Sequence, residues 1–462
     1  MPHAPTPVAP VKPDSPAIPP GADPVDALAR WPADVPVGAF LTLSETPAPD
    51  APWARRSVFV PTARVPGVPG SLRSRALTPI QELRSAINDP RFHGVGATLG
   101  YELGRVLEPA AGHRVGDPGP PVDDRHHPTL TVHPAEGVLT WDSGTRAWTA
   151  TGRVPVAARA REAAFEVTDF VPTSSARAFQ RSVARAIEYI HAGDCFQVNL
   201  AHRLTARFAG APRALGAHLM RAIRPSLGSY IESVHGDGSL ARAVLSLSPE
   251  LFLHVDGATG VVTTRPIKGT RAAADRAADL ERSEKDGAEL AMIVDLMRND
   301  LGRVCAPGTI RVERARDVES FGRDPRSGVR HTVATITGTL APGRTPIDLV
   351  EACFPPGSVT GAPKIRAMQI IEELEPVARG PYCGAIAWFD RSGDATLSVP
   401  IRTLVLTPDP GSTLEHATGT VDLHLGAGIV ADSDPYREWI ETLHKGATIL
   451  APLGQDALAL DR

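Results

Sequence analysis

The sequence has few cysteines, no long apolar run and no excess of charge of one sign. Its four cysteines, Cys195, Cys305, Cys353 and Cys383, show no CxxC spacing, which disfavours a disulfide framework or a zinc site and favours a reducing, cytoplasmic compartment. No run of about 18 apolar residues predicts a membrane span. The 48 basic and 52 acidic residues are well mixed and give a net charge of −4. This balance disfavours a nucleic-acid or membrane partner and favours a small-molecule ligand.

The first 24 residues contain nine prolines. Proline lacks a backbone N–H donor and fixes φ, so this segment is expected to form neither helix nor sheet. We therefore predict a disordered, proline-rich tail over residues 1–27, and it lacks the continuous apolar stretch of a signal peptide. The whole chain of 462 residues, 42% of them hydrophobic, suffices for one large domain or two to three ordinary ones.

The character of the sequence changes near residue 178. Before it, short β-type runs such as 57–61 and 130–134 predominate. Residues 179–194 then carry an apolar stripe at helical spacing that closes at a glycine. The sequence thus predicts a β-rich first region, 28–172, and a second region, 178–450.

In the second region, several β-type runs follow one another with only short turns between them. This succession favours antiparallel sheet over strict alternation of strand and helix. Strands are expected within 241–255, 260–267, 331–338, 384–390 and 395–406, and helices at 283–301, 363–374 and 435–450.

Two of the expected helices carry paired carboxylates. Asp286 and Glu289 share one face of the first, and Glu438 and Glu441 share a face of the last, where Lys445 follows one turn later. Carboxylate ligands without His or Cys suit Mg²⁺ rather than zinc, with open positions for water and an anionic substrate. From the residues alone, a solvated acidic patch and a surface Glu441–Lys445 pair of about 0.3–0.5 kcal/mol remain alternatives.

A lysine and two glycines are further candidates. Lys268, in TTRPIKGTR, follows a β-branched run at a turn; it is either a solvated surface charge or a partly desolvated nucleophile or base. Gly426 and Gly428, in a loop expected at 425–432, would let the backbone approach an anion. Residues 355–364 resemble a phosphate loop, but the order GK followed by Ser or Thr is broken, so nucleotide hydrolysis is not predicted.

Five segments in a fixed order resemble the chorismate-utilising enzymes of the anthranilate synthase component I type. They are RPIKGTR, KDGAELAMIVDLMRNDLGRV, GSVTGAPKIRAM, SVPIRT and GAGIVADSDPYREWIET, and the similarity is dense from about 178 to 450. It is thinner in the first region, where GYELGRVLE (100–108) carries it. The resemblance implies an α+β fold of two large, mostly antiparallel sheets packed face to face, with helices outside and the site in the cleft between the sheets.

The resemblance also implies roles for individual residues. Glu289 and Glu441 would hold Mg²⁺ directly, with Asp286 and Glu438 behind them through water. The substrate, chorismate, carries two carboxylates that fixed cations and N–H donors would hold. The residues implied to bind it are Tyr382, Arg402, Gly426, Gly428, Lys445, Thr270 and Gln197, and those implied in catalysis are Lys268, Glu250 and His331.

Lys268 distinguishes members of this family. Anthranilate synthases usually have alanine there, whereas aminodeoxychorismate synthases have PIKGT; isochorismate and salicylate synthases carry a base lysine where this chain has Gln197. The implied reaction is amination of chorismate to 4-amino-4-deoxychorismate, the precursor of p-aminobenzoate in folate biosynthesis. Lys268 would attack C2, and Glu250 would protonate the departing C4 hydroxyl. The alternatives are anthranilate or 2-amino-2-deoxyisochorismate synthesis, and an inactive subunit that only binds a partner.

The resemblance implies that ammonia comes from a separate glutamine amidotransferase subunit, because none of the four cysteines lies in the G-x-C-x-G elbow of a class I glutaminase. Three features depart from the family pattern. The stretch after Lys268 is short and lacks Pro-Arg-Gly, Ala334 stands where serine is common, and residues 407–422 are longer than usual and read as a surface hairpin. None of these departures removes a proposed catalytic residue.

Overall fold

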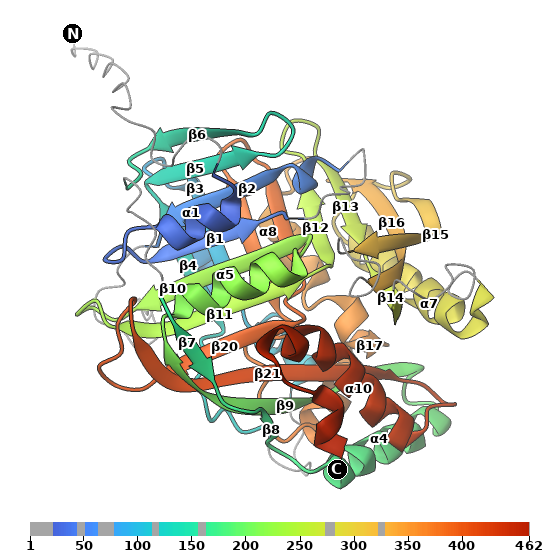
Figure 1. Ribbon diagram of the computed structural model, residues 1–462. Helices are drawn as coiled ribbons and strands as arrows, with labels where there is room; N and C mark the ends of the chain where they lie inside the picture. Colours follow the sequence, from blue (N-terminus) through green and yellow to red (C-terminus); the bar gives the residue numbers. More distant parts are fainter. Residues whose placement is uncertain are drawn as a thin grey trace.

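Two antiparallel sheets with flanking helices form the computed structural model (Figure 1). The structure describes residues 22–43, 51–62, 78–112, 120–155, 163–272, 282–321 and 329–461. The α+β architecture of two large sheets that the sequence predicted is therefore confirmed.

The larger sheet has 12 strands in the described residues. Its hydrogen-bonded order is β17 (Gly361–Ala362), β9 (Gln197–Gly210), β21 (Ala417–Ile429), β20 (Thr403–Pro408), β11 (Leu240–Ser248), β10 (Leu227–Val234), β1 (Val37–Leu41), β2 (Arg56–Pro61), β5 (Gly137–Asp142) and β6 (Ala147–Gly152), and β7 (Phe165–Val167) and β8 (Val171–Pro172) also pair with β9.

The smaller sheet has nine strands in the same described ranges. Its order is β14 (Ile267–Ala272), β16 (Val329–Thr339), β13 (Val261–Arg265), β12 (Leu251–Val255), β19 (Ala395–Ser398), β18 (Ala385–Asp390), β3 (Gly94–Leu99) and β4 (Leu130–Ala135), and β15 (Arg311–Phe321) pairs with β16. The β-type runs 241–255 and 395–406 each hold two strands that belong to different sheets, a division that the sequence analysis did not foresee.

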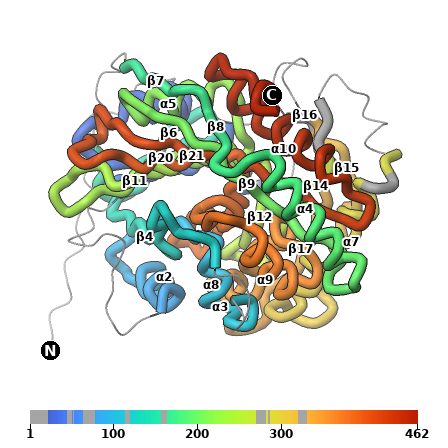
Figure 2. Tube along the Cα trace, turned by 90° about the horizontal axis from the view of Figure 1, so that it is seen from below, coloured from blue at the N-terminus to red at the C-terminus, as the bar shows by residue number. Residues whose placement is uncertain are grey.

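The helices include those that the periodicity predicted. Their bounds are α1 (Pro24–Arg30), α2 (Pro79–Asn88), α3 (Leu103–Leu107), α4 (Ala176–His191), α5 (Pro212–Ile223), α7 (Glu284–Gly302), α8 (Pro346–Cys353), α9 (Lys364–Leu374) and α10 (Pro435–Leu450). Figure 2 shows α4 and α10 side by side next to β9 and β21, which they contact. Within the described ranges, no helix is long and apolar enough to cross a membrane.

The two sheets pack face to face through small apolar clusters. Ile231, Val244 and Val405 of the larger sheet are buried together with Ile386 of the smaller sheet. At Gly96 of β3, a Cβ would lie 2.6 Å from the ring of Phe40 on β1, so this close approach requires glycine. Larger clusters cover the outer faces, where α1, α5 and α10 pack on the larger sheet and α2, α7 and α8 on the smaller one.

Two of the places where the chain crosses between the sheets are neighbours. The chain passes from β11 to β12 through Glu250 and from β19 to β20 through residues 399–402. Ser248 Oγ donates a hydrogen bond to Val399 O at 2.6 Å, and the Leu247 N–H donates to Arg402 O at 3.0 Å. These bonds fix Glu250 and Arg402 at one junction of the two sheets.

The predicted tail over residues 1–27 is wrong at its C-terminal end. Asp23 caps α1 by accepting hydrogen bonds from the N–H groups of Val25 and Asp26, and Val25 and Leu28 are buried in the core. Residues 1–21 lie outside the described residues. The boundary expected between 172 and 178 does not separate two layered units either, because β1 pairs with β10 and β3 with β18.

Candidate active site

Lys268 is a largely buried lysine on β14, not a solvated surface charge. Its side chain is 11% exposed, and its Nζ lies 3.9 Å from Oε2 of Glu289 on α7. Burial lowers the pKa of Lys268 and the nearby Lys445 lowers it further, while Glu289, Glu250 and Glu441 raise it. A lowered pKa increases the share of neutral amine, which is the nucleophilic form.

Glu250 is a buried carboxyl where the chain crosses from β11 to β12. Burial raises the pKa of Glu250 to about 7, although a hydrogen bond from Ser358, the charge of Lys268 and the Ile267 N–H act in the opposite direction. Near neutral pH this group is therefore divided between the protonated and ionised forms. A carboxyl group with such a pKa can donate a proton to a leaving group.

The backbone of β21 approaches Lys268 closely because residue 428 is glycine. A Cβ at Gly428 would lie 2.7 Å from Gln197 Nε2 and 3.2 Å from Lys268 Nζ. Gly426 and Gly428 lie in a strand paired with β9, so the loop expected at 425–432 begins only after Ile429. In the described residues, the pairing of β21 with β20 ends at Leu423. Among the described strands, the glycine segment, residues 424–429, thus has a partner on one edge only.

Two buried polar atoms beside the glycine segment have no hydrogen-bond partner within the described part of the chain. They are Gln197 Oε1 and Asn199 Nδ2. A Cβ at Gly426 would lie 3.2 Å from Asn199 Nδ2 and 2.7 Å from the hydroxyl oxygen of Tyr382. Because buried polar atoms are nearly always hydrogen-bonded, these two indicate a place for a polar ligand. Asn199 was missed by the sequence analysis, since only the fold places it here.

Lys445 ties α10 to the glycine segment. Its Nζ donates to Gly426 O at 2.9 Å and lies 2.8 Å from Oε1 of Glu441. Glu438, one turn earlier, is buried and accepts a hydrogen bond from Ser433 Oγ at 2.6 Å. The Glu441–Lys445 pair therefore does more than stabilise an exposed helix face, because the lysine also holds the backbone of β21.

His331 pairs with β14 at Thr270 and lies next to Arg402. His331 Nδ1 lies 3.4 Å from Gly269 O, and its Nε2 lies 3.5 Å from Nη2 of Arg402. Burial and the Arg402 charge lower the pKa of His331 to about 3, so the imidazole is neutral. Since a guanidinium only donates hydrogen bonds, Nε2 is assigned as the acceptor and Nδ1 as the N–H donor.

The four carboxylates predicted to hold Mg²⁺ lie on two helices. Glu289 on α7 and Glu441 on α10 both raise the pKa of Lys268, so their charges act on the same small region. Asp286 and Glu438 each lie one turn before them. In the described residues, no three His, Cys, Asp or Glu side chains form a set that could hold a metal by themselves. Mg²⁺ commonly binds through only one or two carboxylates, together with waters and an anionic substrate, so the residues fit such an ion.

The segment that resembles a phosphate loop has a structural role instead. The Nζ of Lys364 lies 2.5 Å from Oδ2 of Asp300 and donates to Cys353 O at 2.6 Å, so it is held in the core. Ser358 of the same segment donates the hydrogen bond to Glu250, a contact that the sequence did not reveal. The side chain of Thr270, also predicted to bind substrate, lies outside the described residues.

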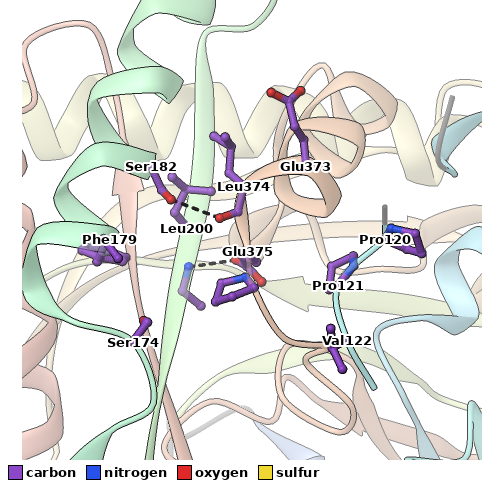
Figure 3. A pocket seen from close by; sticks show the side chains of 13 residues that line it. Pro120, Pro121, Val122, Ser174, Phe179, Ser182, Leu200, Glu373, Leu374 and Glu375 are labelled. Carbon is purple, nitrogen blue, oxygen red and sulfur yellow. Dashed lines mark hydrogen bonds between the residues drawn. The ribbon is translucent and has the colours of Figure 1, made fainter. Parts of the chain in front are cut away.

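A separate pocket of about 380 Å³ lies between α4, β9 and the end of α9 (Figure 3). Phe179, Leu200, Leu374 and Glu375 are among its lining residues. Its described lining includes none of the residues predicted to bind substrate or metal or to act in catalysis. Glu250, Glu289, Glu441 and Lys445 instead act on Lys268, and Gly428 lies beside its amine.

Comparison with known proteins agrees with this arrangement. The sequence matches the chorismate binding enzymes over residues 75–451. It is 38% identical to aminodeoxychorismate synthase component 1 of Klebsiella aerogenes over 382 residues, which are 79% of this chain and 78% of that protein. It is 46% identical to anthranilate synthase component 1 of Streptomyces coelicolor over 279 residues, which are 59% of this chain and 50% of the relative. The chain thus spans about half the length of the latter protein.

Among solved structures, anthranilate synthase component I from Streptococcus pneumoniae has the same fold. The two superpose with a TM-score of 0.70 at 26% identity, over 88% of this chain and 95% of the other. The region matched to the family includes every residue described above around Lys268. From its matched length, its fold and its site, the chain belongs to the family of chorismate binding enzymes.

Proposed function

We propose that this chain is the chorismate-aminating component of an aminodeoxychorismate synthase, which forms 4-amino-4-deoxychorismate from chorismate and ammonia. The observation that carries the proposal is the burial of the Lys268 amine at the glycine segment, 3.9 Å from Glu289. The relative from Klebsiella aerogenes, which bears this name, matches over most of both chains. A buried amine with a lowered pKa suits a nucleophile better than a structural charge.

In the proposed first step, the Lys268 amine attacks C2 of chorismate. A C2–N bond forms, the ring double bonds shift, and the C4–O bond breaks. The departing hydroxyl takes a proton from Glu250, whose raised pKa keeps a proton available near neutral pH. Water is the leaving product, and the substrate ring is then joined to Lys268.

In the proposed second step, ammonia attacks C4. A C4–N bond forms, the double bonds shift back, and the C2–N bond to Lys268 breaks, so the lysine amine is regenerated. The proton that the attacking nitrogen loses restores the Glu250 carboxyl. Arg402, the neutral His331 and the backbone at Gly426 and Gly428 would hold the substrate carboxylate and ring. Gln197 Oε1 and Asn199 Nδ2 would find hydrogen-bond partners in the same substrate.

We also propose a bound Mg²⁺ that Glu289 and Glu441 hold, with Asp286 and Glu438 behind them. When bound, the ion would balance the charge of the ring carboxylate of chorismate and orient it. The ammonia would come from a separate glutamine amidotransferase. The word component in the names of the relatives supports a second subunit.

Anthranilate synthesis is the second candidate, because the relative from Streptomyces coelicolor that carries that name reaches 46% identity. The two reactions differ in the ring carbon that finally carries nitrogen. Product identification distinguishes them directly.

The first expected result is that the purified chain, given chorismate, Mg²⁺ and ammonium, forms the 4-amino product and does not use glutamine. Chromatography with mass spectrometry would identify the product, and reference compounds would separate it from anthranilate. The rate should rise with pH at fixed total ammonium, because the un-ionised amine attacks. The matched controls are one reaction without glutamine and one reaction without ammonium. Anthranilate as the main product, or efficient use of glutamine by the single chain, would contradict the proposal.

The second expected result concerns the acid role of Glu250. At a fixed concentration of un-ionised ammonia, turnover should fall as the pH rises above about 7, because the protonated form of Glu250 is then lost. Glu250→Gln should lower kcat on the order of 10²- to 10⁴-fold. A Ser358→Ala variant tests the assignment: the Ser358 hydrogen bond lowers the pKa of Glu250, so its loss should move the descending limb to higher pH. If the descending limb of the pH–rate profile stays in place in this variant, the limb reports the titration of another group.

A further inference from the structure

Arg379, in the segment between α9 and β18, is a fully buried arginine that the mechanism above does not use. Its Nε and Nη2 donate to the two carboxylate oxygens of Glu375, at 2.9 and 2.6 Å. Its Nη1 donates to Val359 O at 2.9 Å, and its Nη2 also donates to Asn199 O at 2.7 Å. The ring of Tyr101 lies 4.4 Å from the guanidinium carbon. Burying a charge is unfavourable unless such bonds replace its water.

Both backbone carbonyls that Arg379 binds belong to segments of the active site. Asn199 pairs with Gly428, and its buried amide nitrogen lacks a partner within the described residues. Val359 follows Ser358, which donates the hydrogen bond to Glu250. One guanidinium therefore connects the strand that supports the glycine segment with the segment that binds the proposed acid.

Glu375 holds the same strand through a hydrogen bond of its own. Its Oε1 accepts a hydrogen bond from the Ala201 N–H at 2.8 Å, and Ala201 pairs with Gly426. Figure 3 shows the Glu375 carboxylate reaching this nitrogen of β9 at the wall of the pocket. The ion pair thus binds β9 on both sides of Leu200, opposite the two glycines.

Tyr382, three residues after Arg379, completes the connection. Its ring centroid lies 5.9 Å from the guanidinium carbon, and its hydroxyl oxygen lies next to Gly426. A displacement of Arg379 would therefore shift Tyr382, the glycine segment and Ser358 together. These three features belong to different segments of the chain. Among the contacts described above, only those of Arg379 connect all three.

We infer that Arg379, held by Glu375, is a positioning residue that fixes the glycine segment, Ser358 and Tyr382 relative to one another for substrate binding. None of its described hydrogen bonds goes to a residue proposed to react, so it acts through the segments that it holds. The inference rests on the proposed function only in taking this site as the place where chorismate binds. The role requires arginine, because a lysine ammonium lacks the planar fork that reaches two carbonyls and a carboxylate at once.

The competing interpretation is an ion pair that only stabilises the fold. The two differ in their effect on KM. A variant with fewer folded molecules has a lower apparent kcat but an unchanged KM for chorismate, whereas a displaced glycine segment weakens chorismate binding in every folded molecule. We expect Arg379→Lys to raise KM and to lower kcat/KM on the order of tenfold to a hundredfold per folded molecule. Glu375→Gln keeps an acceptor for Ala201 and should raise KM less.

The chain offers a matched control in Arg213 and Glu232. Arg213 binds both oxygens of the buried Glu232, at 2.8 and 2.6 Å, and donates to the carbonyls of Trp31, Pro32 and Val35, in the core cluster beneath α1 and α5. Arg213→Lys should lower the Tm as Arg379→Lys does, but leave the KM within about twofold, since a loss confined to folded population does not alter affinity.

The experiment measures Tm by circular dichroism, and kcat and KM for chorismate at a temperature where each variant is folded. Wild-type KM and kcat per folded molecule in both Arg379→Lys and Glu375→Gln would overturn the inference. Equal rises of KM in the Arg213 and Arg379 variants would also overturn it. If the wild-type product is anthranilate, the proposed function fails, but the comparison of KM values still decides the role of Arg379.

Discussion

Lys268→Ala should lower formation of the 4-amino product on the order of 10³-fold or more while chorismate binding is kept. The amine is the only part of Lys268 that the proposed reaction uses, and the hydrogen bond from Thr332 to the Lys268 backbone is unaffected by the change. Ammonia could then attack C2 directly, because alanine restores the residue usual in anthranilate synthases. We therefore expect a minor product aminated at C2, which mass spectrometry and chromatography would detect beside the 4-amino compound.

Lys364→Ala is the matched control for this variant. Both lysine side chains are 11% exposed and both contact a carboxylate, but Lys364 pairs with Asp300 in the core. Loss of this lysine should lower the Tm, because the buried Asp300 then keeps only the half-exposed Arg303 as a counter-charge, and should leave the product unchanged. Unchanged formation of the 4-amino product by Lys268→Ala would refute the nucleophile, because amination at C4 would then proceed without the lysine amine.

Local sequence patterns predicted the secondary structure well where one continuous pattern corresponds to a single helix or strand. The helix from Pro435 to Leu450 has the predicted bounds, because Asp434 caps it, Pro435 suits its first turn and its apolar side chains recur at helical spacing. Long β-type runs were harder to interpret. Residues 241–255 form two strands of different sheets, and the crossing at Glu250 depends on pairing with residues 399–402, which no local pattern encodes.

The candidate site was predicted in the same uneven way. Paired carboxylates, close glycines and Lys268 are visible in the sequence because their spacing or residue type is unusual. Asn199, Ser358 and Arg379 are not, because each acts through contacts with segments that are distant in sequence. The N-terminal end of the fold was misjudged for a related reason: the many prolines suggested a tail through residue 27, yet Asp23 starts a helix that buries Val25 and Leu28.

The largest effect of a charge change is expected for the two carboxylates proposed to hold Mg²⁺. Chelator should abolish activity and added Mg²⁺ should restore it, and Glu289→Gln or Glu441→Gln should lower kcat/KM by an amount equivalent to several kcal/mol. Glu441 is 50% exposed and pairs with Lys445 at 2.8 Å, so its loss should change the free energy of unfolding by less than about 0.5 kcal/mol. Titration calorimetry with Mg²⁺ and chorismate would measure ion binding independently of turnover.

Glu289 could act by holding the metal ion or by changing the pKa of Lys268, and the two roles predict different effects of Glu289→Gln. Glu289 raises the pKa of Lys268, so Glu289→Gln leaves more of the neutral, nucleophilic amine, and an enzyme without a metal ion should not lose activity through that amine. A large loss in this variant therefore points to the ion. Glu351→Gln is the surface control, because Glu351 is 42% exposed and pairs only with Arg84 among the described ion pairs. Full activity of Glu289→Gln or Glu441→Gln in the presence of chelator would refute the metal site.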